Sequence, residues 1–328
     1  MTQEKLPFVS IIIPVLNGAT QVDTCIESLH SLDYPNDCYE IIVIDNGSTD
    51  NSLDKLKKLS VILLTEQKKG RAHALNAGLK ICKGSIICST DISCIAEPLW
   101  LKQMTSHFQD PGVGCVAGEI KLLKDLDNAI TSFQERQNYM SPMYAKNRNK
   151  PPFLPFADGA NCAFRKDVFD QIGPFEEQFF KAADVEICYR MQILTDYKIV
   201  FDQLAILWEP GEPTFAALLK QRYRIGAGRE LMQIKYPLIY ADNRLSLKQY
   251  YWSLRNRLKS LGTFCKSFIL SFSDLAQRTV CYDIIILLSM QIAGKAGRLF
   301  APSIIKNKHL SLTPVDTAKQ VEFLSKFN

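Results

Sequence analysis

The sequence predicts an α/β protein with a doubly wound, mostly parallel sheet that has helices on both faces. Between residues 9 and 117, strand-length runs of β-branched residues alternate with segments whose apolar residues recur at helical spacing. This alternation favours parallel strands, because a parallel connection needs a crossover that is usually a helix. The apolar run over 39–45 stops at a polar loop, as the buried strands of such sheets do.

The expected elements follow the chain in order. Strand Val9–Pro14 comes first and ends at the proline, which cannot donate to a strand ladder. The elements expected after it are a helix over 20–31, a strand over 39–45, a helix over 52–59, a strand over 61–65, a helix over 72–82, a strand over 85–90, a helix over 98–108, a strand over 114–117 and a helix over 184–194. An exposed loop is expected over 146–152.

The composition is that of a globular chain. Its 328 residues are 47% hydrophobic and 22% charged, which is enough to build a core. The ten cysteines form no CxxC pair and no cluster with histidine, so a zinc site and a secreted disulfide framework are both disfavoured. The polar segment 1–7 does not resemble a signal peptide. We therefore expect a cytoplasmic protein with reduced cysteines.

Positive charge is concentrated near the C-terminus. Residues 244–308 hold 11 Lys and Arg against 2 Asp and Glu, a local charge of +9, so the rest of the chain carries −4 (5 − 9). Apolar residues recur at helical spacing over 245–272, which fits either an amphipathic helix on a membrane surface or a soluble helical cap. The apolar run 284–288 is too short to predict a membrane span, and the tail after 308 is expected to be polar and mobile. No readout motif accompanies the charge, so nucleic acid is not an expected partner.

Polar residues follow two strands of the expected sheet. Asp45, Asn46 and Ser48 follow one strand, and Asp91 follows another. Carboxyl ends of parallel strands meet at one edge of the sheet, where ligands of open α/β sheets bind. Asp45 would there face a nucleoside, although Asp-Asn-Gly-Ser is also typical of a simple turn that begins a helix. Asp184 lies in the first turn of a later expected helix, where either helix capping or chemistry accounts for a carboxylate.

Seven segments together resemble the family-2 glycosyltransferases, which have the GT-A fold. Each segment alone is weak, but their order and spacing over residues 8–230 match the family pattern. The segments are Ser10–Asn17, Ile41–Asp50, Gly70–Arg71 with Asn76–Gly78, Thr90–Ser93, Gly159–Arg165, Ala183–Glu186 and Gln221–Arg224.

The resemblance implies a role for each matching residue. The donor would be a UDP- or GDP-linked sugar, held by Pro14, Asn17, Asp45, Asn46, Ser48, Arg71, Asn76, Asp91, Arg222 and Arg224. The acceptor pocket would include Gly159, Ala160, Asn161 and Glu186. Asp184 would be the general base that deprotonates the acceptor hydroxyl. Asp91 would bind Mg²⁺ or Mn²⁺, with Ser93 and Glu209 as further candidate ligands.

The sequence departs from the family pattern at three positions. Ser93 replaces the second acid of the Asp-x-Asp element, and Ala183 replaces the Glu that usually precedes the catalytic acid. Glu209 could supply the missing oxygen ligand or be only a solvated loop acid. Ile225 replaces the Trp of the processive Gln-x-x-Arg-Trp signature, which favours a single-addition transferase over a polymerase.

The expected activity is sugar transfer with inversion, dependent on a divalent cation, to a polysaccharide, glycolipid or lipid-linked acceptor at the inner membrane face. A catalytic domain is expected over 1–235, followed by a helical basic region over 236–328 with peripheral membrane contact. One rival is a GT-A-like nucleotidyltransferase, whose glycine-rich basic loop is missing at 16–19. The other is an inactive sugar- or nucleotide-binding scaffold. A dinucleotide site is disfavoured because no G-x-G-x-x-G follows the first strand.

Overall fold

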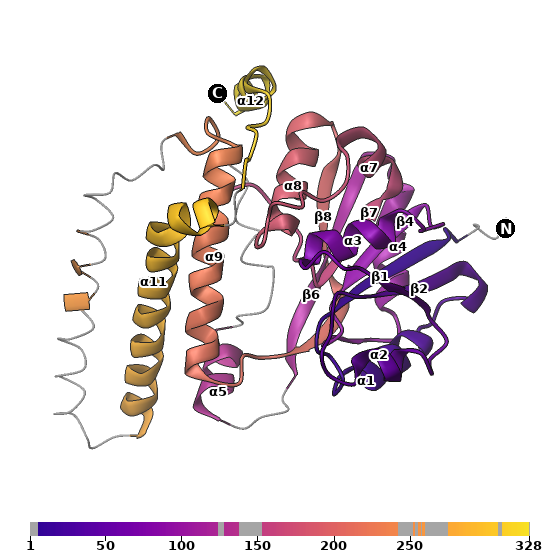
Figure 1. The fold of residues 1–328 in the computed structure, drawn as a ribbon, viewed down its shortest axis with the longest axis horizontal. Coiled ribbons are helices and arrows are strands. Elements are labelled where there is room, and N and C mark those ends of the chain that lie inside the picture. Colours follow the sequence, from indigo (N-terminus) through magenta and orange to yellow (C-terminus); the bar gives the residue numbers. More distant parts are fainter. Residues whose placement is uncertain are drawn as a thin grey trace. The chain divides into compact units, whose positions relative to one another are not determined.

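A computed structural model describes residues 6–123, 128–137, 153–241, 252, 255–256, 258–259, 275–307 and 310–327 (Figure 1). The chain divides into two compact units. The first consists of Met1–Asp125, Asn138–Gly211 and Ser325–Asn328, and the second of Leu126–Gln137 and Glu212–Leu324.

The first unit contains an eight-stranded sheet in the order β3-β2-β1-β4-β7-β6-β8-β5. Strands β3, β2, β1 and β4 run parallel to one another, as the sequence predicted. The strands are β1 (Val9–Val15), β2 (Tyr39–Asp45), β3 (Ile62–Thr65), β4 (Ile86–Thr90), β5 (Ile95–Ala96), β6 (Val113–Leu123), β7 (Asn161–Arg165) and β8 (Lys198–Pro210).

Helices connect these strands and cover the sheet on both faces, which confirms the predicted fold class (Figure 1). Ile11 and Ile13 of β1 face the core cluster that contains Ile26 of α1 and Trp100 of α4. On the other side, Gly78 of α3 lies so close that an added Cβ would be 2.6 Å from Ile12. The helices are α1 (Val22–His30), α2 (Ser52–Leu56), α3 (Arg71–Leu79), α4 (Trp100–Ser106), α7 (Lys166–Ile172) and α8 (Ala183–Leu194), with short 3₁₀ turns at Asn36–Cys38 and His107–Gln109.

The sheet is more mixed than the sequence predicted. Strand β7 runs antiparallel to both β4 and β6, and the two-residue strand β5 runs antiparallel to β8. Helix α7 was not predicted either. Because β7 runs against β4, Asn161 at the start of β7 pairs with Thr90 at the end of β4. The loop before β7 therefore reaches the carboxyl edge of the parallel strands.

The second unit is helical and contains α5 (Ala129–Arg136), α9 (Phe215–Lys235), α11 (Leu275–Asn307) and α12 (Thr317–Ser325). Helix α9 packs along α11 within the second unit, whose later segment begins at Glu212, whereas the catalytic domain was expected to end at 235 (Figure 1). Asn128 begins α5 with a capping box that includes Thr131.

The C-terminal expectations have mixed outcomes. The loop expected over 146–152 lies outside the described residues, as does the helix expected over 245–272 apart from five scattered positions. The apolar run 284–288 lies inside α11, whose segment Tyr282–Ala301 is long and apolar enough to cross a membrane, with a mean hydropathy of 1.4. The expectation of a mobile tail was wrong, because helix α12 buries Phe323 and Gln320 Nε2 donates to the carbonyl of Val315 at 2.6 Å.

Two glycines bring α9 and α11 into direct backbone contact. A Cβ added to Gly226 of α9 would overlap the carbonyl oxygen of Gly294, and one added to Gly297 of α11 would overlap that of Tyr223. A Cβ added to Gly294 would lie 3.6 Å from the carbonyl oxygen of Arg222, an ordinary contact. The close approach therefore depends on Gly226 and Gly297 and not on Gly294.

We predict that Gly226→Ala lowers the free energy of unfolding by about 1–3 kcal/mol, because the overlap forces the two helices apart. Gly294→Ala is the matched control and should leave stability unchanged or raise it by up to ~1 kcal/mol through helix propensity. Urea denaturation followed by circular dichroism measures both. Equal stability of the two variants would contradict this packing.

Candidate active site

The carboxyl edge of the parallel strands gathers most of the predicted site. Asp45 ends β2 in register with Val15, near the end of β1. Asp91 follows β4 directly, and the loop before β7 ends beside it because Thr90 pairs with Asn161, the first residue of β7. Residues from four separate chain segments therefore meet at one edge, as expected for an open α/β sheet.

The expected nucleoside-binding region consists of two loops that are joined by hydrogen bonds. The carboxylate of Asp45, which is 3% exposed, accepts hydrogen bonds from the backbone N–H groups of Gly47 at 3.2 Å and Ser48 at 3.3 Å. Asn17 has a φ of 58°, and its side-chain oxygen accepts from the N–H of Thr49 at 2.8 Å. Its own N–H donates to Ser48 Oγ at 2.9 Å. Asp45, Asn17 and Ser48 thus meet in one place. Pro14 lies just before them in β1, which continues to Val15, one residue beyond its expected end at the proline.

A second set of contacts fixes the same two loops. Ser52 Oγ accepts from the N–H of Gly18 at 2.8 Å, and the carboxylate of Asp50 accepts from the N–H of Ala19 at 3.1 Å. The Ser52 side chain also donates to Asp50, and this bond lowers the pKa of Asp50. The two loops are therefore held before any ligand arrives.

Asn46 is a support and not a free ligand-binding group. It is 4% exposed, and its side-chain nitrogen donates to the carbonyls of Glu66 at 3.0 Å and Lys68 at 2.8 Å. Its side-chain oxygen accepts from the N–H of Gly70 at 2.7 Å. The amide of Asn46 is committed to the loop that begins α3, and its expected contact with the donor stays a prediction. Asn46 positions Arg71, the next residue after that loop.

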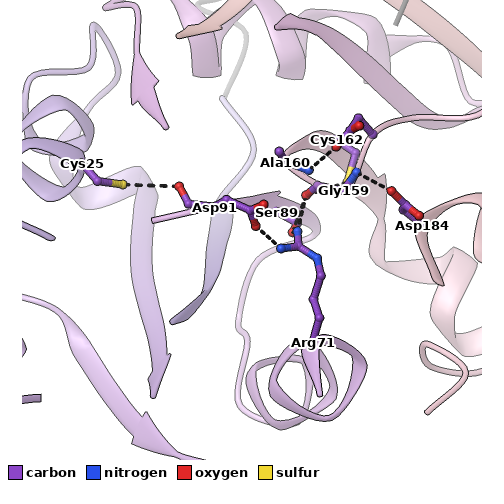
Figure 2. Close-up of polar contacts among 9 residues, drawn as sticks. Cys25, Arg71, Ser89, Asp91, Gly159, Ala160, Cys162 and Asp184 are labelled. Atoms are coloured by element: carbon purple, nitrogen blue, oxygen red, sulfur yellow. Dashed lines mark hydrogen bonds and ion pairs between the residues drawn. The ribbon is translucent and has the colours of Figure 1, made fainter. Parts of the chain in front are cut away.

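Arg71 joins the two halves of the edge. Its guanidinium forms an ion pair with Asp91 and donates to the carbonyl of Gly159 at 2.7 Å (Figure 2). Its second contact with a side chain is to Ser89 Oγ at 3.3 Å, and Ser89 in turn donates to the Gly159 carbonyl at 2.9 Å. Figure 2 shows the Arg71 side chain extending between Asp91 and the loop of Gly159. One cationic side chain thus connects the strand β4 end to the loop before β7.

Asp184 lies on the far side of Gly159 from Arg71 (Figure 2). One of its carboxylate oxygens accepts from the N–H of Gly159 at 3.1 Å, and the other accepts from the N–H of Val185 at 2.9 Å. The residue that begins the helix, Ala182, has a left-handed φ of 65°. Such a conformation is uncommon for a residue other than glycine, so the chain turns sharply just before Asp184.

Sequence reasoning missed Asp158, which belongs to the same loop. One oxygen of its carboxyl group accepts from the N–H of Ala160 at 2.9 Å. Burial, and then the charge of Asp184, raises the pKa of Asp158 above its ordinary value. The available signal was an acid directly before the Gly159 motif, but Asp-Gly is also an ordinary turn sequence.

Three other predicted site residues are buried and bound to protein groups. Asn161 is 0% exposed, and its amide bonds to Trp100 and to two backbone carbonyls. Glu186 is 0% exposed and pairs with Arg190 at 3.0 Å. Asn76 is 5% exposed and bonds to both backbone groups of Phe175. These side chains therefore support the surrounding loops and strands, and their expected place in the donor or acceptor pocket stays a prediction.

The candidate cation ligands form an incomplete set. Asp91 supplies one carboxylate, and Ser93 lies in the turn after it and is partly exposed. Burial, then the charge of Glu209, raises the pKa of Cys94, which places Glu209 near the same turn. Within the described part of the chain, no group of three or more His, Cys, Asp and Glu could hold a metal ion. These oxygens suit a cation such as Mg²⁺ that takes its other ligands from water and phosphates.

The predicted residues of the Gln-x-x-Arg segment belong to the second unit. Arg222 and Arg224 both lie on α9, where Arg222 is half-buried and Arg224 is exposed. Their expected role beside the diphosphate remains a prediction.

Comparison with known proteins agrees with this architecture. The glycosyltransferase AglE of Haloferax volcanii is 29% identical over 254 residues, which cover 75% of this chain and 78% of the relative. The beta-monoglucosyldiacylglycerol synthase of Nostoc sp. is 25% identical over 256 residues, which cover 75% of this chain but only 54% of the relative. The solved structure of the mannosyltransferase PcManGT from Pyrobaculum calidifontis in complex with GDP-Man and Mn²⁺ has a similar fold. Its TM-score is 0.64 at 19% identity, with 94% of this chain and 89% of that chain covered.

Two family models match the sequence. Residues 10–173 match the model described as glycosyl transferase family 2, and residues 95–311 match the model described as glycosyl transferase family group 2. The first match includes the loops of Asp45, Arg71, Asp91 and Gly159, and the second includes Asp184. The chain therefore belongs to glycosyl transferase family 2, and it is a transferase of the GT-A fold that uses a nucleotide-sugar donor.

Proposed function

We propose that this enzyme transfers a sugar with inversion from a UDP- or GDP-linked donor to a hydroxyl group of a polysaccharide, glycolipid or lipid-linked acceptor. The observation that carries the proposal is the contact of Arg71 with both Asp91 and Gly159, while Gly159 also holds Asp184. A donor group at Asp91 and an acceptor group at Asp184 would then lie on either side of one loop. Such a spacing suits an in-line displacement.

On the donor side, Asp45 with Asn17 and Ser48 would hold the nucleoside, and Arg71 would face the diphosphate. Arginine suits this task because its planar guanidinium binds phosphate oxygens in pairs. Mg²⁺ or Mn²⁺ at Asp91, with Glu209 and Ser93 as further oxygen ligands, would supply positive charge against the diphosphate as it leaves. Arg71 would then pair with the diphosphate as well as with Asp91.

On the acceptor side, Asp184 would take the proton of the acceptor hydroxyl. As that proton moves to the carboxylate, the hydroxyl oxygen forms a bond to the anomeric carbon of the sugar. The bond from that carbon to the diphosphate breaks on the opposite face, which inverts the configuration. The N–H groups of Gly159 and Val185 fix the carboxylate in place for this step.

We predict that one of UDP and GDP binds in the presence of Mn²⁺ and loses affinity in EDTA, as measured by calorimetric titration. Asp91→Asn should weaken this metal-dependent binding by about 10–100-fold, because a charged partner of the cation is lost. Asp110→Asn is the control, since Asp110 forms an ion pair with Lys198 at 2.6 Å. Absence of nucleotide binding under every condition would contradict the proposed donor site.

We predict that Asp184→Asn lowers the turnover number by about 10²–10⁴-fold without weakening nucleotide affinity, because a general base contributes that much. The control is Asp167→Asn, because Asp167 also lies in the first turn of a helix but on α7. Release of nucleotide from the donor measures turnover. A loss of stability equal in both variants, with turnover retained, would show that Asp184 only caps its helix.

We further propose that the second unit lies on an anionic membrane surface. In α11, Asp283 is paired with Arg136 at 2.5 Å and Arg298 lies 3.9 Å from Glu230, so these charges have partners within the unit. Only 22% of the apolar segment Tyr282–Ala301 is buried, and Tyr282 and Phe300 are 51% and 53% exposed. The +9 charge of residues 244–308 would add attraction to anionic lipid. The Nostoc relative is named a beta-monoglucosyldiacylglycerol synthase, and a diacylglycerol lipid is consistent with such a location.

We predict that the protein floats with vesicles of phosphatidylcholine and phosphatidylserine in equal parts, and less with phosphatidylcholine alone. Tyr282→Ser with Phe300→Ser should weaken binding by about 10-fold, because two exposed aromatic side chains no longer enter the interface. Val321→Ser on α12 is the control, since Val321 is 58% exposed and apolar. Equal flotation of both variants would rule out α11 as the membrane-binding surface.

A further inference from the structure

The loop before β7 holds two carboxyl groups with consecutive backbone N–H groups. Gly159 N–H donates to Asp184 at 3.1 Å, and Ala160 N–H donates to Asp158 at 2.9 Å. The first carboxyl comes from helix α8 and the second from the loop itself. Nothing in the family pattern assigned a role to Asp158, yet the loop presents it beside the proposed general base.

The second oxygen of Asp158 is available to a ligand. Across the part of the chain that the structure describes, this oxygen has no hydrogen-bond partner, and the residue is partly exposed. Asp45 differs in this respect, since both of its carboxylate oxygens accept hydrogen bonds, from the backbone N–H groups of Gly47 and Ser48. Asp158 is thus held by one oxygen and open at the other.

The charges around Asp158 determine what it can bind. Asp184 on α8 opposes ionisation of Asp158, whereas Arg71 on α3 and Lys181 before α8 favour it. Cys94, in the turn after Asp91, also lies within the range of its charge. Burial is the largest effect, and together with Asp184 it raises the pKa of Asp158. A carboxyl group that takes up a proton readily can both donate to and accept from an uncharged hydroxyl.

Gly159 keeps the two carboxyl groups close. A Cβ added there would lie 3.1 Å from the guanidinium of Arg71 and 3.4 Å from Cβ of Asp184. The loop therefore has little room to shift between its neighbours, and the spacing of the two carboxyl groups is set by packing.

We infer that Asp158 binds a second hydroxyl group of the acceptor, next to the one that Asp184 deprotonates, so that the acceptor is a sugar or another compound with neighbouring hydroxyl groups. This inference rests on the proposed function and narrows it, because an acceptor with a single isolated hydroxyl would leave Asp158 without a partner. Asp158 is then a specificity-determining residue and not the base.

The test compares two small acceptors that differ by one hydroxyl group, ethylene glycol and ethanol. The donor is the UDP- or GDP-linked sugar whose nucleotide binds in the titration. We expect the wild type to transfer to ethylene glycol about 10-fold faster per hydroxyl group than to ethanol, because one additional hydrogen bond is worth that much. Asp158→Ala should bring the two rates per hydroxyl group together while donor hydrolysis by water continues.

A stability measurement separates this role from simple support of the loop. Because the pKa of Asp158 is higher in the folded protein than in the unfolded chain, where it is about 4, ionisation of Asp158 lowers stability as the pH rises above about 4. Asp158→Asn should therefore raise the melting temperature at pH 7 and leave it unchanged near pH 4. Asp50 is the matched control, because it also accepts loop N–H bonds but its pKa is lowered. Ionised Asp50 stabilises the fold at every pH above the pKa that Asp50 has in the unfolded chain. Asp50→Asn should therefore lower the melting temperature at pH 7.

Three results would overturn the inference. In the first, the wild type transfers to ethylene glycol and ethanol at equal rates per hydroxyl group. In the second, it transfers to neither alcohol. In the third, Asp158→Ala lowers the transfer rate equally for both alcohols and also lowers the melting temperature. Failure of the proposed function itself would look different, since the wild type would then neither bind nor hydrolyse any nucleotide sugar.

Discussion

The arrangement of the site depends on the guanidinium of Arg71, which binds Asp91 and the carbonyl of Gly159 at once. Strand β4 ends at the first partner and strand β7 follows the second, so the contact closes the edge of the sheet where parallel strands give way to an antiparallel one. Without a cation at this point, the half-buried carboxylate of Asp91 would lie at the sheet edge without its ion-pair partner, which is costly. The loop that carries Asp158 and Gly159 is therefore held against the donor side by the same charge that neutralises Asp91.

Much of the fold follows from local pattern, and the rest depends on distant partners. Strands β1 to β4 were predicted because each is an apolar run next to a helix-period segment, and both signals lie within a few residues. Strand β7 was not predicted, since its five residues become a strand only by pairing with β4, whose partner Thr90 is far away in the sequence. Helix α12 was missed for a similar reason. Its polar sequence hides Phe323 and Gln320, which are buried only because other parts of the second unit cover them.

The candidate site also combines features that local sequence predicts with features that depend on distant partners. Residue types were predictable from the resemblance, and Asp45, Arg71, Asp91 and Asp184 do occupy one sheet edge. Their partners were not predictable, because an asparagine that binds a ligand and one that holds a loop look alike in sequence. Asn46, Asn76 and Asn161 use their amides on backbone groups far along the chain. A buried amide with every hydrogen bond made inside the protein fixes geometry and offers little to a substrate.

Two aspartates at this edge show how environment separates support from recognition. Asp50 is surrounded by donors, so its ionised form is favoured and its pKa falls. Asp158 has a single N–H donor, and burial, followed by the charge of Asp184, raises its pKa and disfavours its ionised form. A carboxyl group that serves only to tie a loop is expected to resemble the first case, because its stabilising bonds are strongest when it is charged. Asp158 instead keeps an open oxygen at a cost in stability, and an acceptor hydroxyl is the uncharged partner that such an oxygen suits.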